Sequence, residues 1–303
     1  MELVTGLLAA ALSAATPIAL ASLGGIFTYH ANTFNIAMEG MMLAGAFFAV
    51  AASYLTGSWA AGVAAAVGAG LLLAALFALV AIGLRCDEFV TGIAINMLAL
   101  GGTTFLLRLW FNVKGALVSP RIAALPRWHI PGLEQVPFLG DVLSGHAFLV
   151  YVTWAAVAAV HWVIFSTRFG LRLRASGESP DAAASLGVSP SRYKYWAALL
   201  SGLLSGLAGA YLSLGYVSLF TENMSNGRGW IALAAIILVR ARPVPMLLIS
   251  LLFGFFDGMG MALQGAKFPA QLTHMLPYLA TLLALYSYAR TARRRRLAEG
   301  VTS

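Results

Sequence analysis

Long apolar blocks separated by short polar stretches dominate the pattern along this chain. A helix needs about 18 or more apolar residues to cross a membrane. Blocks of that kind fall near residues 6–24, 36–55, 59–84, 89–110, 147–166, 195–219, 243–262 and 271–289. The pattern predicts an all-α integral membrane protein, a single polytopic bundle over residues 1–303 with about eight full transmembrane helices.

A further apolar block at 229–239 is too short to be assigned in the same way. Its eleven residues would span only about 16 Å as a helix, roughly half of the hydrocarbon thickness. We therefore expect one short membrane helix in addition to the full spans. Whether that helix crosses the membrane completely stays open on the sequence alone.

The longest charged interruption is residues 167–194, TRFGLRLRASGESPDAAASLGVSPSRYK. Ser179 is a candidate N-cap, and Pro180 suits the first helical position because its missing N–H would be unpaired there anyway. Asp181 falls in the first turn, where the helix dipole favours an anion, and Gly187 supplies a left-handed stop. The segment therefore predicts a short capped helix, which either docks on a partner or belongs to an ordinary loop.

Basic residues at the ends of the blocks predict the orientation. Cytoplasmic loops carry an excess of Lys and Arg, and the richest clusters here are 167–194 and the tail 290–303. Both share one side if the short block at 229–239 counts as a crossing, with the N-terminus outside and the C-terminus cytoplasmic. The proline-rich segment 111–145 is then an outer loop, either a partner site or a lid over the bundle.

Composition and charge exclude several classes of protein. The chain has 60% hydrophobic and 10% charged residues, against about 25% charged residues in globular proteins. The net charge of +8 does not indicate nucleic-acid binding, because the basic residues cluster at the ends of apolar blocks. The sequence has one cysteine and lacks a phosphate loop, H-E-x-x-H and G-x-S-x-G. We expect a transport subunit with no catalytic residues, no metal site and no cofactor of its own.

Four polar residues within or beside apolar blocks are candidate pathway residues, namely Asn35, Glu39, Asn96 and Asp257. A charged residue at the bilayer centre costs about 2.5–3.5 kcal/mol on insertion scales, so it needs a partner or a function. On a helix that starts near Asn35, Glu39 lies one turn further on the same face. The pair then either lines a polar cavity, or Glu39 simply stabilises a helix N-terminus. Asn96 either binds solute or joins two helices by a hydrogen bond, and Asp257 should face the bundle interior, water or a partner subunit.

Three segments resemble signature blocks of the permease subunits of ABC importers. They are NIAMEGMMLAGAFFA at 35–49, DEFVTGIAINMLALGGTTFLLR at 87–108 and GRGWIALAAIILVRARP at 227–243. The resemblance keeps the order of the blocks over nearly the whole chain, and it is to the simple-sugar and nucleoside group, related to branched-chain amino-acid and ribose permeases. The third block departs from the family, because Leu238-Val239-Arg240 stands where glycine is common.

The resemblance implies that the motor is in other chains. Permeases of this kind carry a cytoplasmic E-A-A-x-x-x-G loop that docks in a groove of a separate ATPase, which binds the ATP. The matching residues here, with Asp in place of Glu, are Ser179, Pro180, Asp181, Ala182, Ala183, Leu186 and Gly187. The resemblance further implies a second permease, expected as a different chain in a heterodimer, an extracytoplasmic solute-binding protein, and a place in the lipid of the bacterial inner membrane. The expected solute is a nucleoside or a simple sugar, moved by alternating access.

Two other functions stay open at this point. A secondary transporter driven by an ion gradient would use Glu39 and Asp257 as ion-coupling groups. A structural or regulatory membrane subunit would have no pathway, and the helix at 179–187 would serve only for docking. Uptake by this chain alone under an ion gradient would favour the first, and loss of uptake in Glu39→Ala or Asp257→Ala proteins that still bind their partners would argue against the second.

Overall fold

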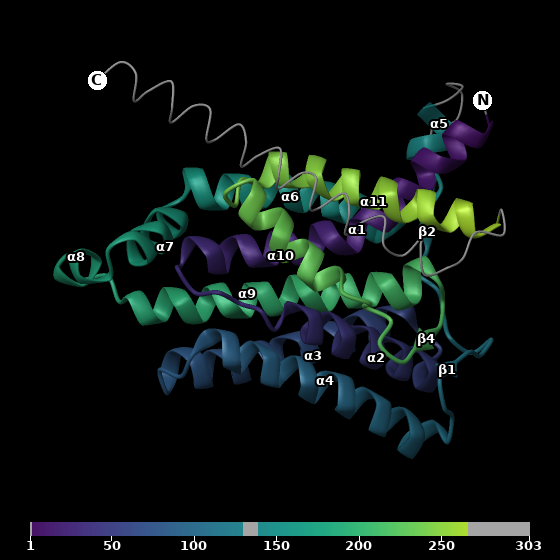
Figure 1. Cartoon of the computed structure of the whole chain (residues 1–303), viewed down its shortest axis with the longest axis horizontal. Coiled ribbons are helices and arrows are strands. Elements are labelled where there is room, and N and C mark those ends of the chain that lie inside the picture. The colour runs from purple at the N-terminus through teal and green to yellow at the C-terminus, as the bar shows by residue number, and fades with distance from the viewer. Residues whose placement is uncertain (1, 130–138, 266–303) are drawn as a thin grey trace.

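The computed structural model describes residues 2–129 and 139–265, and helices dominate this part of the chain (Figure 1). Seven of the described helices are long and apolar enough to cross a membrane. They are α1 (Glu2–His30), α2 (Met38–Thr56), α3 (Trp59–Phe77) with a π-helical extension (Ala78–Gly83), α4 (Glu88–Phe111), α6 (Phe148–Ser166), α9 (Pro190–Ala210) with a π-helical extension (Tyr211–Tyr216), and α11 (Pro243–Gly265). The shorter helices are α5 (Leu139–Leu143), α7 (Arg168–Glu178), α8 (Pro180–Ser185) and α10 (Arg228–Leu238).

The predicted all-α membrane bundle is confirmed. Every apolar block predicted within the described range is one of these helices, and the short block at 229–239 is α10, with eleven residues. Boundaries differ by a few residues, as at α9, which starts at Pro190 instead of 195. The block predicted at 271–289 and the basic tail at 290–303 lie outside the described residues.

Helix ends follow local chemistry. Asp87 caps α4, because its Oδ1 accepts the N–H of Val90 at 2.8 Å. α4 ends at Asn112 with φ +52°, and α2 ends at Gly57 with φ +66°. A left-handed residue after the last turn lets its N–H reach back to the carbonyls of the helix that it ends. The stop at Gly57 produces the short connection from α2 to α3, whereas the stop at Asn112 begins the long segment that leads to α6.

α9 lies at the centre of the bundle and packs against α1, α2 and α3. Its backbone approaches theirs very closely. A Cβ atom on Gly202 would lie 2.3 Å from the Cβ of Ala74, and one on Gly209 would lie 2.1 Å from the carbonyl oxygen of Met42. Membrane helices can approach to this extent only where both surfaces carry small residues.

This packing gives a first prediction. We expect Gly202→Ala to lower the free energy of unfolding by about 1–3 kcal/mol, the usual range for overpacking a filled core. Gly68→Ala on α3 is the matched control, because a Cβ there meets no atom within 4 Å and alanine favours a helix by about 0.5–1 kcal/mol over glycine. Thermal unfolding in detergent measures both variants, and equal stability would contradict the packing.

The end of the bundle opposite α8 carries the segment between α4 and α6 (Figure 1). β1 (Ala116–Leu117) pairs antiparallel with β4 (Phe220–Thr221), and β2 (Arg127–Trp128) pairs antiparallel with β3 (His146–Ala147). The serine of α2 at this end adds a third anchor, because Ser53 Oγ accepts the N–H of Ala123 at 2.9 Å. The segment predicted as an outer loop, 111–145, is thus tied down at several points along its described part.

Candidate functional site

The segment between α6 and α9 leaves the bundle at one end, where α8 forms the tip of the molecule (Figure 1). It contains a helix that the sequence reasoning missed, the amphipathic α7, in which Leu173 and Ser176 are buried. Thr167 starts α7, since its Oγ1 accepts the N–H of Gly170 at 3.2 Å. The signal for this helix was present as Phe169 and Leu173 four residues apart, but the surrounding arginines suggested a loop.

α8 matches the predicted helix except at its cap. Gly187 ends it with φ +77°, and the N–H of Gly187 donates to the carbonyl oxygen of Ala184 at 2.9 Å. The expected side-chain cap by Ser179 is wrong, because the side chain makes no capping hydrogen bond. The backbone of Ser179 links the two helices, because its N–H donates to the carbonyl oxygen of Ala175 of α7 and its carbonyl oxygen accepts the N–H of Ala183, the first intrahelical bond of α8, each at 3.0 Å. One residue therefore ends one helix and starts the next.

α2 begins inside the bundle and not at the end where α1 finishes. The chain returns from His30 as an irregular segment, and α2 starts only at Met38. The expected helix start near Asn35 is therefore wrong, because the Asn35 side chain is turned to partners outside that helix. Its Nδ2 donates to Ser201 Oγ of α9 at 2.9 Å, and its Oδ1 accepts the N–H of Ala37 at 3.1 Å.

Asn96 holds the first turn of α2 against α4. Its Oδ1 accepts the N–H of Gly40 at 2.7 Å, and its Nδ2 donates to the carbonyl oxygen of Ile36 at 3.1 Å. α4 starts at Glu88, so Asn96 lies about 12 Å along that helix. The amide therefore satisfies backbone groups within the apolar depth of the bundle and joins two helices there.

The Glu39 carboxylate closes the N-terminus of α10. Glu39 belongs to the first turn of α2, yet its Oε1 accepts the N–H of Gly227 at 2.8 Å and its Oε2 accepts that of Gly229 at 2.6 Å. A helix N-terminus has N–H groups without partners and a positive partial charge, and a carboxylate satisfies both. Glycine is needed for the approach, because a Cβ on Gly229 would lie 2.6 Å from the Cα of Glu39.

Arg228 stands between these two glycines and pairs with Asp257 of α11. The distance from its Nη2 to Oδ2 is 2.8 Å, and the two side chains are 15% and 22% exposed. α11 starts at Pro243, so Asp257 lies about 21 Å along it. An acid at this depth requires a partner, and Arg228 of the same chain supplies it.

We call this set the polar junction: Asn35, Glu39, Asn96, Arg228 and Asp257. The structure thus brings all four predicted pathway residues into one region, where the described contacts are to protein groups. Beside Asn35 there is a cavity of only about 10 Å³, room for roughly one water molecule. The space in that cavity is too small for a solute molecule.

Sequence reasoning missed the partners in the junction. A signal for Gly227 and Gly229 was present, since Gly-Arg-Gly stands directly before a short apolar block. Ser201 gave no signal, because a serine in an apolar helix with many small residues looks like a packing residue. The pairing of Asn35 with Ser201 joins positions 166 residues apart.

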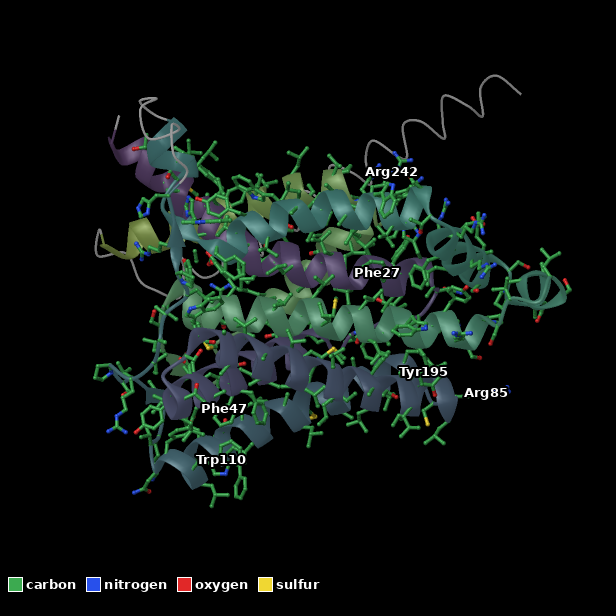
Figure 2. The ribbon with its side chains drawn as sticks, turned by 180° about the vertical axis from the view of Figure 1, so that it is seen from behind. Phe27, Phe47, Arg85, Trp110, Tyr195 and Arg242 are labelled. Carbon is green, nitrogen blue, oxygen red and sulfur yellow. The ribbon has the colours of Figure 1, made fainter. Side chains whose placement is uncertain are left out.

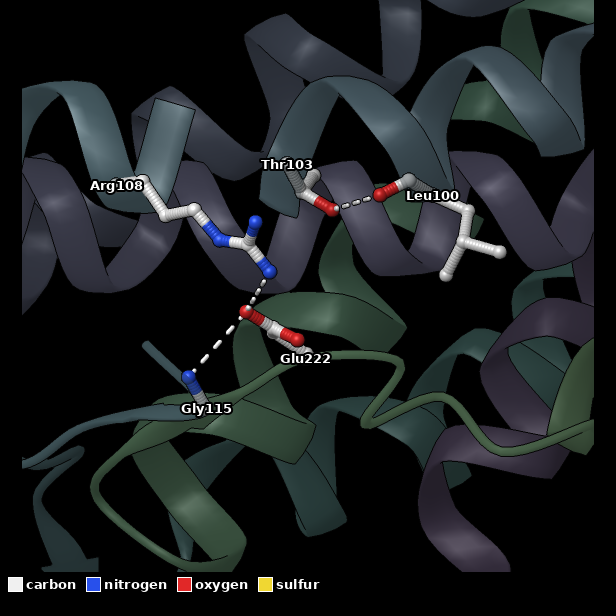
Figure 3. Close-up of polar contacts among 5 residues, drawn as sticks. All are labelled: Leu100, Thr103, Arg108, Gly115 and Glu222. Carbon is white, nitrogen blue, oxygen red and sulfur yellow. Dashed lines mark hydrogen bonds and ion pairs between the residues drawn. The ribbon is translucent and has the colours of Figure 1, made fainter. Parts of the chain in front are cut away.

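A second polar contact, drawn in Figure 3, lies at the end of the bundle opposite α8. Arg108 at the end of α4 lies 3.5 Å from Oε1 of Glu222, and the N–H of Gly115 donates to the same oxygen at 3.2 Å. The Arg108 and Glu222 side chains are 54% and 30% exposed. This contact therefore ties the start of the outer segment to the chain just before α10.

We expect the two ion pairs to have different coupling free energies, because their side chains differ in exposure to solvent. In double-mutant cycles with alanine, we expect about 1–3 kcal/mol for Arg228 and Asp257, because a single substitution leaves a partly buried charge alone. For Arg108 and Glu222, which are more exposed, we expect less than about 1 kcal/mol. Thermal stability in detergent measures both cycles. Equal couplings would show that the junction pair is no more shielded from water than the outer one.

Known proteins are similar to this chain over most of its length. The family model described as the permease component of branched-chain amino acid transport systems matches residues 7–285. The guanosine ABC transporter permease protein NupQ of Bacillus subtilis is 34% identical over 300 residues, which cover 95% of this chain and 93% of NupQ. A Haloferax volcanii protein assigned to glucose ABC transport as a permease is 32% identical and covers 87% of this chain and 79% of its own.

The fold has a solved counterpart. A chain from an inward-facing structure of an ABC transporter, described as of the metal-chelate type, aligns over 93% of this chain and 85% of its own. The TM-score is 0.56 at 17% sequence identity, so the likeness concerns the fold. The family is shown by the family model and by the relatives at 32–34% identity over most of the chain. The chain belongs to the permease component family of branched-chain amino acid transport systems.

Proposed function

We propose that the chain is the permease of an ATP-driven importer, that it moves a nucleoside by alternating access, and that α8 couples it to a separate ATPase. The observation that carries the proposal is α8 itself. It is a short helix with defined ends that stands outside the bundle, and residues 186–189 lead from it directly into the central helix α9.

The surface of α8 suits a docking role. Leu186 is 83% exposed at its end, and Asp181, Ala182 and Ala184 are exposed beside it. An apolar side chain that projects into water at a tip is the type of anchor that a partner's groove covers. Ala183 is buried, so the helix keeps one face against its own chain and offers the other.

The distribution of charge supports a cytoplasmic position for α8. Figure 2 shows Arg85 and Arg242 at the same end of the bundle as α7 and α8. Other basic residues of that end lie on α7 and at the start of α9: Arg168, Arg172, Arg174, Arg192 and Lys194. The opposite end has Arg108, Lys114, Arg121 and Arg127. The excess favours a cytoplasmic α8 and an extracytoplasmic start of α1.

A movement of α8 would reach the polar junction through α9. Ser201 of α9 holds Asn35, which precedes α2, and Glu39 of α2 holds α10. ATPase closure on α8 would therefore shift the start of α2 relative to the start of α10. In this scheme the junction opens and closes the pathway, and its members Asn35, Glu39, Asn96 and Asp257 line the pathway.

The proposal includes two further partners. A second permease, expected as a homologous but different chain, completes the pathway, and a solute-binding protein meets the end that carries residues 112–147. ATP binds to the ATPase alone. A nucleoside is preferred to a sugar because the guanosine permease matches more of both chains than the glucose permease does.

An ion-gradient mechanism finds less support in the geometry. It would need a carboxylate that exchanges an ion during transport. Glu39 already accepts two backbone N–H groups, and Asp257 is paired with Arg228. Both carboxylates are thus bonded to protein groups, as is typical of structural residues and not of a site that exchanges an ion.

The test is a tagged purification from native membranes in mild detergent, together with uptake of labelled guanosine and glucose by whole cells. We expect an ATPase with a phosphate loop and a second permease to co-elute, and the ATPase to be lost when residues 179–187 are replaced by a Gly-Ser linker. A chain that stays alone after crosslinking would overturn the proposal. Uptake of glucose but not guanosine would overturn the nucleoside assignment alone.

A further inference from the structure

A cavity of about 530 Å³ lies where α7 meets the last turn of α1, beside the start of α8. Its wall combines residues from three parts of the chain: Tyr29 and Phe34 around the end of α1, Phe165 at the end of α6, and Arg174 and Glu178 on α7. This volume is within the usual range for small-molecule sites, which combine apolar and aromatic walls with a few polar groups. The cavity shares Tyr29 and Phe34 with the small cavity beside Asn35, but none of the five residues of the polar junction lines it.

Arg174 is a cation in this wall that has no ion-pair partner among the described residues. Its guanidinium lies 5.3 Å from the centre of the Phe165 ring, and its Nε is buried without a hydrogen-bond partner among the described residues. The ion pairs found in residues 2–129 and 139–265 are Arg108–Glu222 and Arg228–Asp257, so Arg174 is in neither. Buried guanidinium N–H groups are normally paired, and an anion in the cavity would supply the missing charge.

The aromatic side chains indicate what the rest of the ligand is. The rings of Tyr29 and Phe34 lie 6.3 Å apart, and Phe165 stands against the ring of His30 at 5.8 Å. The planes of the rings stand at 57° for Tyr29 and Phe34 and at 88° for His30 and Phe165, so the rings form aromatic walls next to the Arg174 guanidinium. A flat ring of a ligand can stack on one of these walls, as bases do on aromatic side chains in proteins that bind single-stranded nucleic acid.

Two further groups at the rim fit hydroxyl and anionic substituents. Glu178 carries an acceptor that suits hydroxyl or amino groups, although it would repel a phosphate placed beside it. Lys194 adds a second cation near the rim, because its Nζ donates to the backbone oxygen of Asn32, a wall residue, at 3.4 Å. The anion therefore belongs on the Arg174 side of the cavity and the hydroxyl groups on the Glu178 side.

We propose that this cavity is a binding site for a nucleotide-like ligand, an aromatic ring that carries hydroxyl groups and a phosphate. The phosphate pairs with Arg174, and the ring packs among the aromatic side chains of Tyr29, Phe34 and Phe165. The site lies at the same end of the molecule as α8.

A regulatory consequence follows, and it rests on the proposed function. α7 already packs tightly on α1, since a Cβ on Gly177 would lie 2.2 Å from the carbonyl oxygen of His30. A ligand that bridges Phe165, Tyr29 and Arg174 would tie α7 more firmly to the bundle and restrict α8, which follows it. Cytoplasmic nucleotide would then lower transport-coupled ATP hydrolysis.

Direct binding tests the site without any assumption about transport. The full chain is purified in detergent and titrated by calorimetry with guanosine monophosphate, guanosine, inorganic phosphate and phosphatidylglycerol. We expect guanosine monophosphate to bind with one-to-one stoichiometry. Guanosine and inorganic phosphate should each bind at least about tenfold more weakly, since each lacks one half of the recognised chemistry.

Two variants and a control locate the ligand. Arg174→Gln should weaken guanosine monophosphate about tenfold or more and leave guanosine unchanged, because it removes the charge that pairs with phosphate. Phe165→Leu should weaken both ligands and keeps an apolar side chain in case Arg174→Gln fails to fold. Arg168→Gln is the matched control, since it removes the same charge from the same helix at an exposed position outside the cavity.

The outcomes separate the sources of phosphate. Equal weakening by Arg168→Gln and Arg174→Gln would mean a general charge effect and would overturn the site. Binding of phosphatidylglycerol that depends on Arg174, with no binding of guanosine monophosphate, would assign the cavity to a lipid headgroup and overturn the nucleotide proposal. Nucleotide binding in a chain that proves to have no ATPase partner would support the site and remove only its regulatory role.

Discussion

Replacing Glu39 by alanine should destabilise the bundle and stop uptake. The change leaves the N–H groups of Gly227 and Gly229 without an acceptor at membrane depth, and each such group costs about 1–3 kcal/mol. It also removes the charge that faces the positive end of α10. We expect a loss of about 2–6 kcal/mol in the free energy of unfolding and at least a tenfold loss, about 1.4 kcal/mol or more, in uptake.

Glu88→Ala is the matched control for this prediction. Glu88 also stands in the first turn of a helix and also accepts a backbone N–H, that of Phe34, but at an exposed position. Water can replace its carboxylate there, so the expected change in stability is below about 1 kcal/mol. Glu39→Gln should be intermediate, because its amide keeps one acceptor oxygen. The role assigned to Glu39 fails if Glu39→Ala is as stable and as active as Glu88→Ala.

Replacing Gly187 by leucine should uncouple the permease from its ATPase while the chain still inserts and folds. Gly187 has φ +77° and open space around the position of a Cβ, so the effect is one of backbone strain and not of a clash. A left-handed non-glycine residue costs about 1–3 kcal/mol, and α8 has only six residues with which to resist it. We expect the helix to end differently and the exposed Leu186 to leave its docked position.

Gly57→Leu provides the same strain at the opposite end of the bundle. Gly57 has φ +66° and equally open surroundings, and it joins α2 to α3. Both variants should lose similar stability, but only Gly187→Leu should lose co-purification of the ATPase and solute-stimulated ATP hydrolysis. If both keep full uptake, the coupling role of α8 is wrong. If both lose uptake equally while keeping the ATPase, general stability explains the loss.

The transmembrane helices could be predicted from the sequence because their signal is local. A block of apolar residues requires a helix in lipid whatever its neighbours do, since no other structure pairs its backbone groups internally. The stop at Gly187 was predictable for the same reason. The start of α2 was not, because Asn35 finds its partner on α9, and the apolar pattern cannot show that the chain stays irregular until Met38.

The candidate site was predictable in its residue types but not in its pairings. Polar residues at membrane depth stand out in any apolar block, so Glu39 and Asp257 were found. Their partners depend on the packing of α2, α10 and α11, which follows from many contacts at once. Ser179 shows the converse limit. It is a good capping residue and it precedes α8 as expected, but its side chain makes no capping hydrogen bond, and its backbone N–H still bonds to Ala175 of α7.

The contact between Glu39 and the N-terminus of α10 also fixes an order of events during synthesis of the chain. Gly227 and Gly229 follow Glu39 by 188 and 190 residues. At a synthesis rate of about 5–20 residues per second, the carboxylate waits roughly 10–40 s for the amides that will hold it. During that interval the start of α2 cannot settle in lipid and has to be kept by water or by the insertion machinery. The hairpin of α1 and α2 is therefore completed only after the start of α10 has been synthesised.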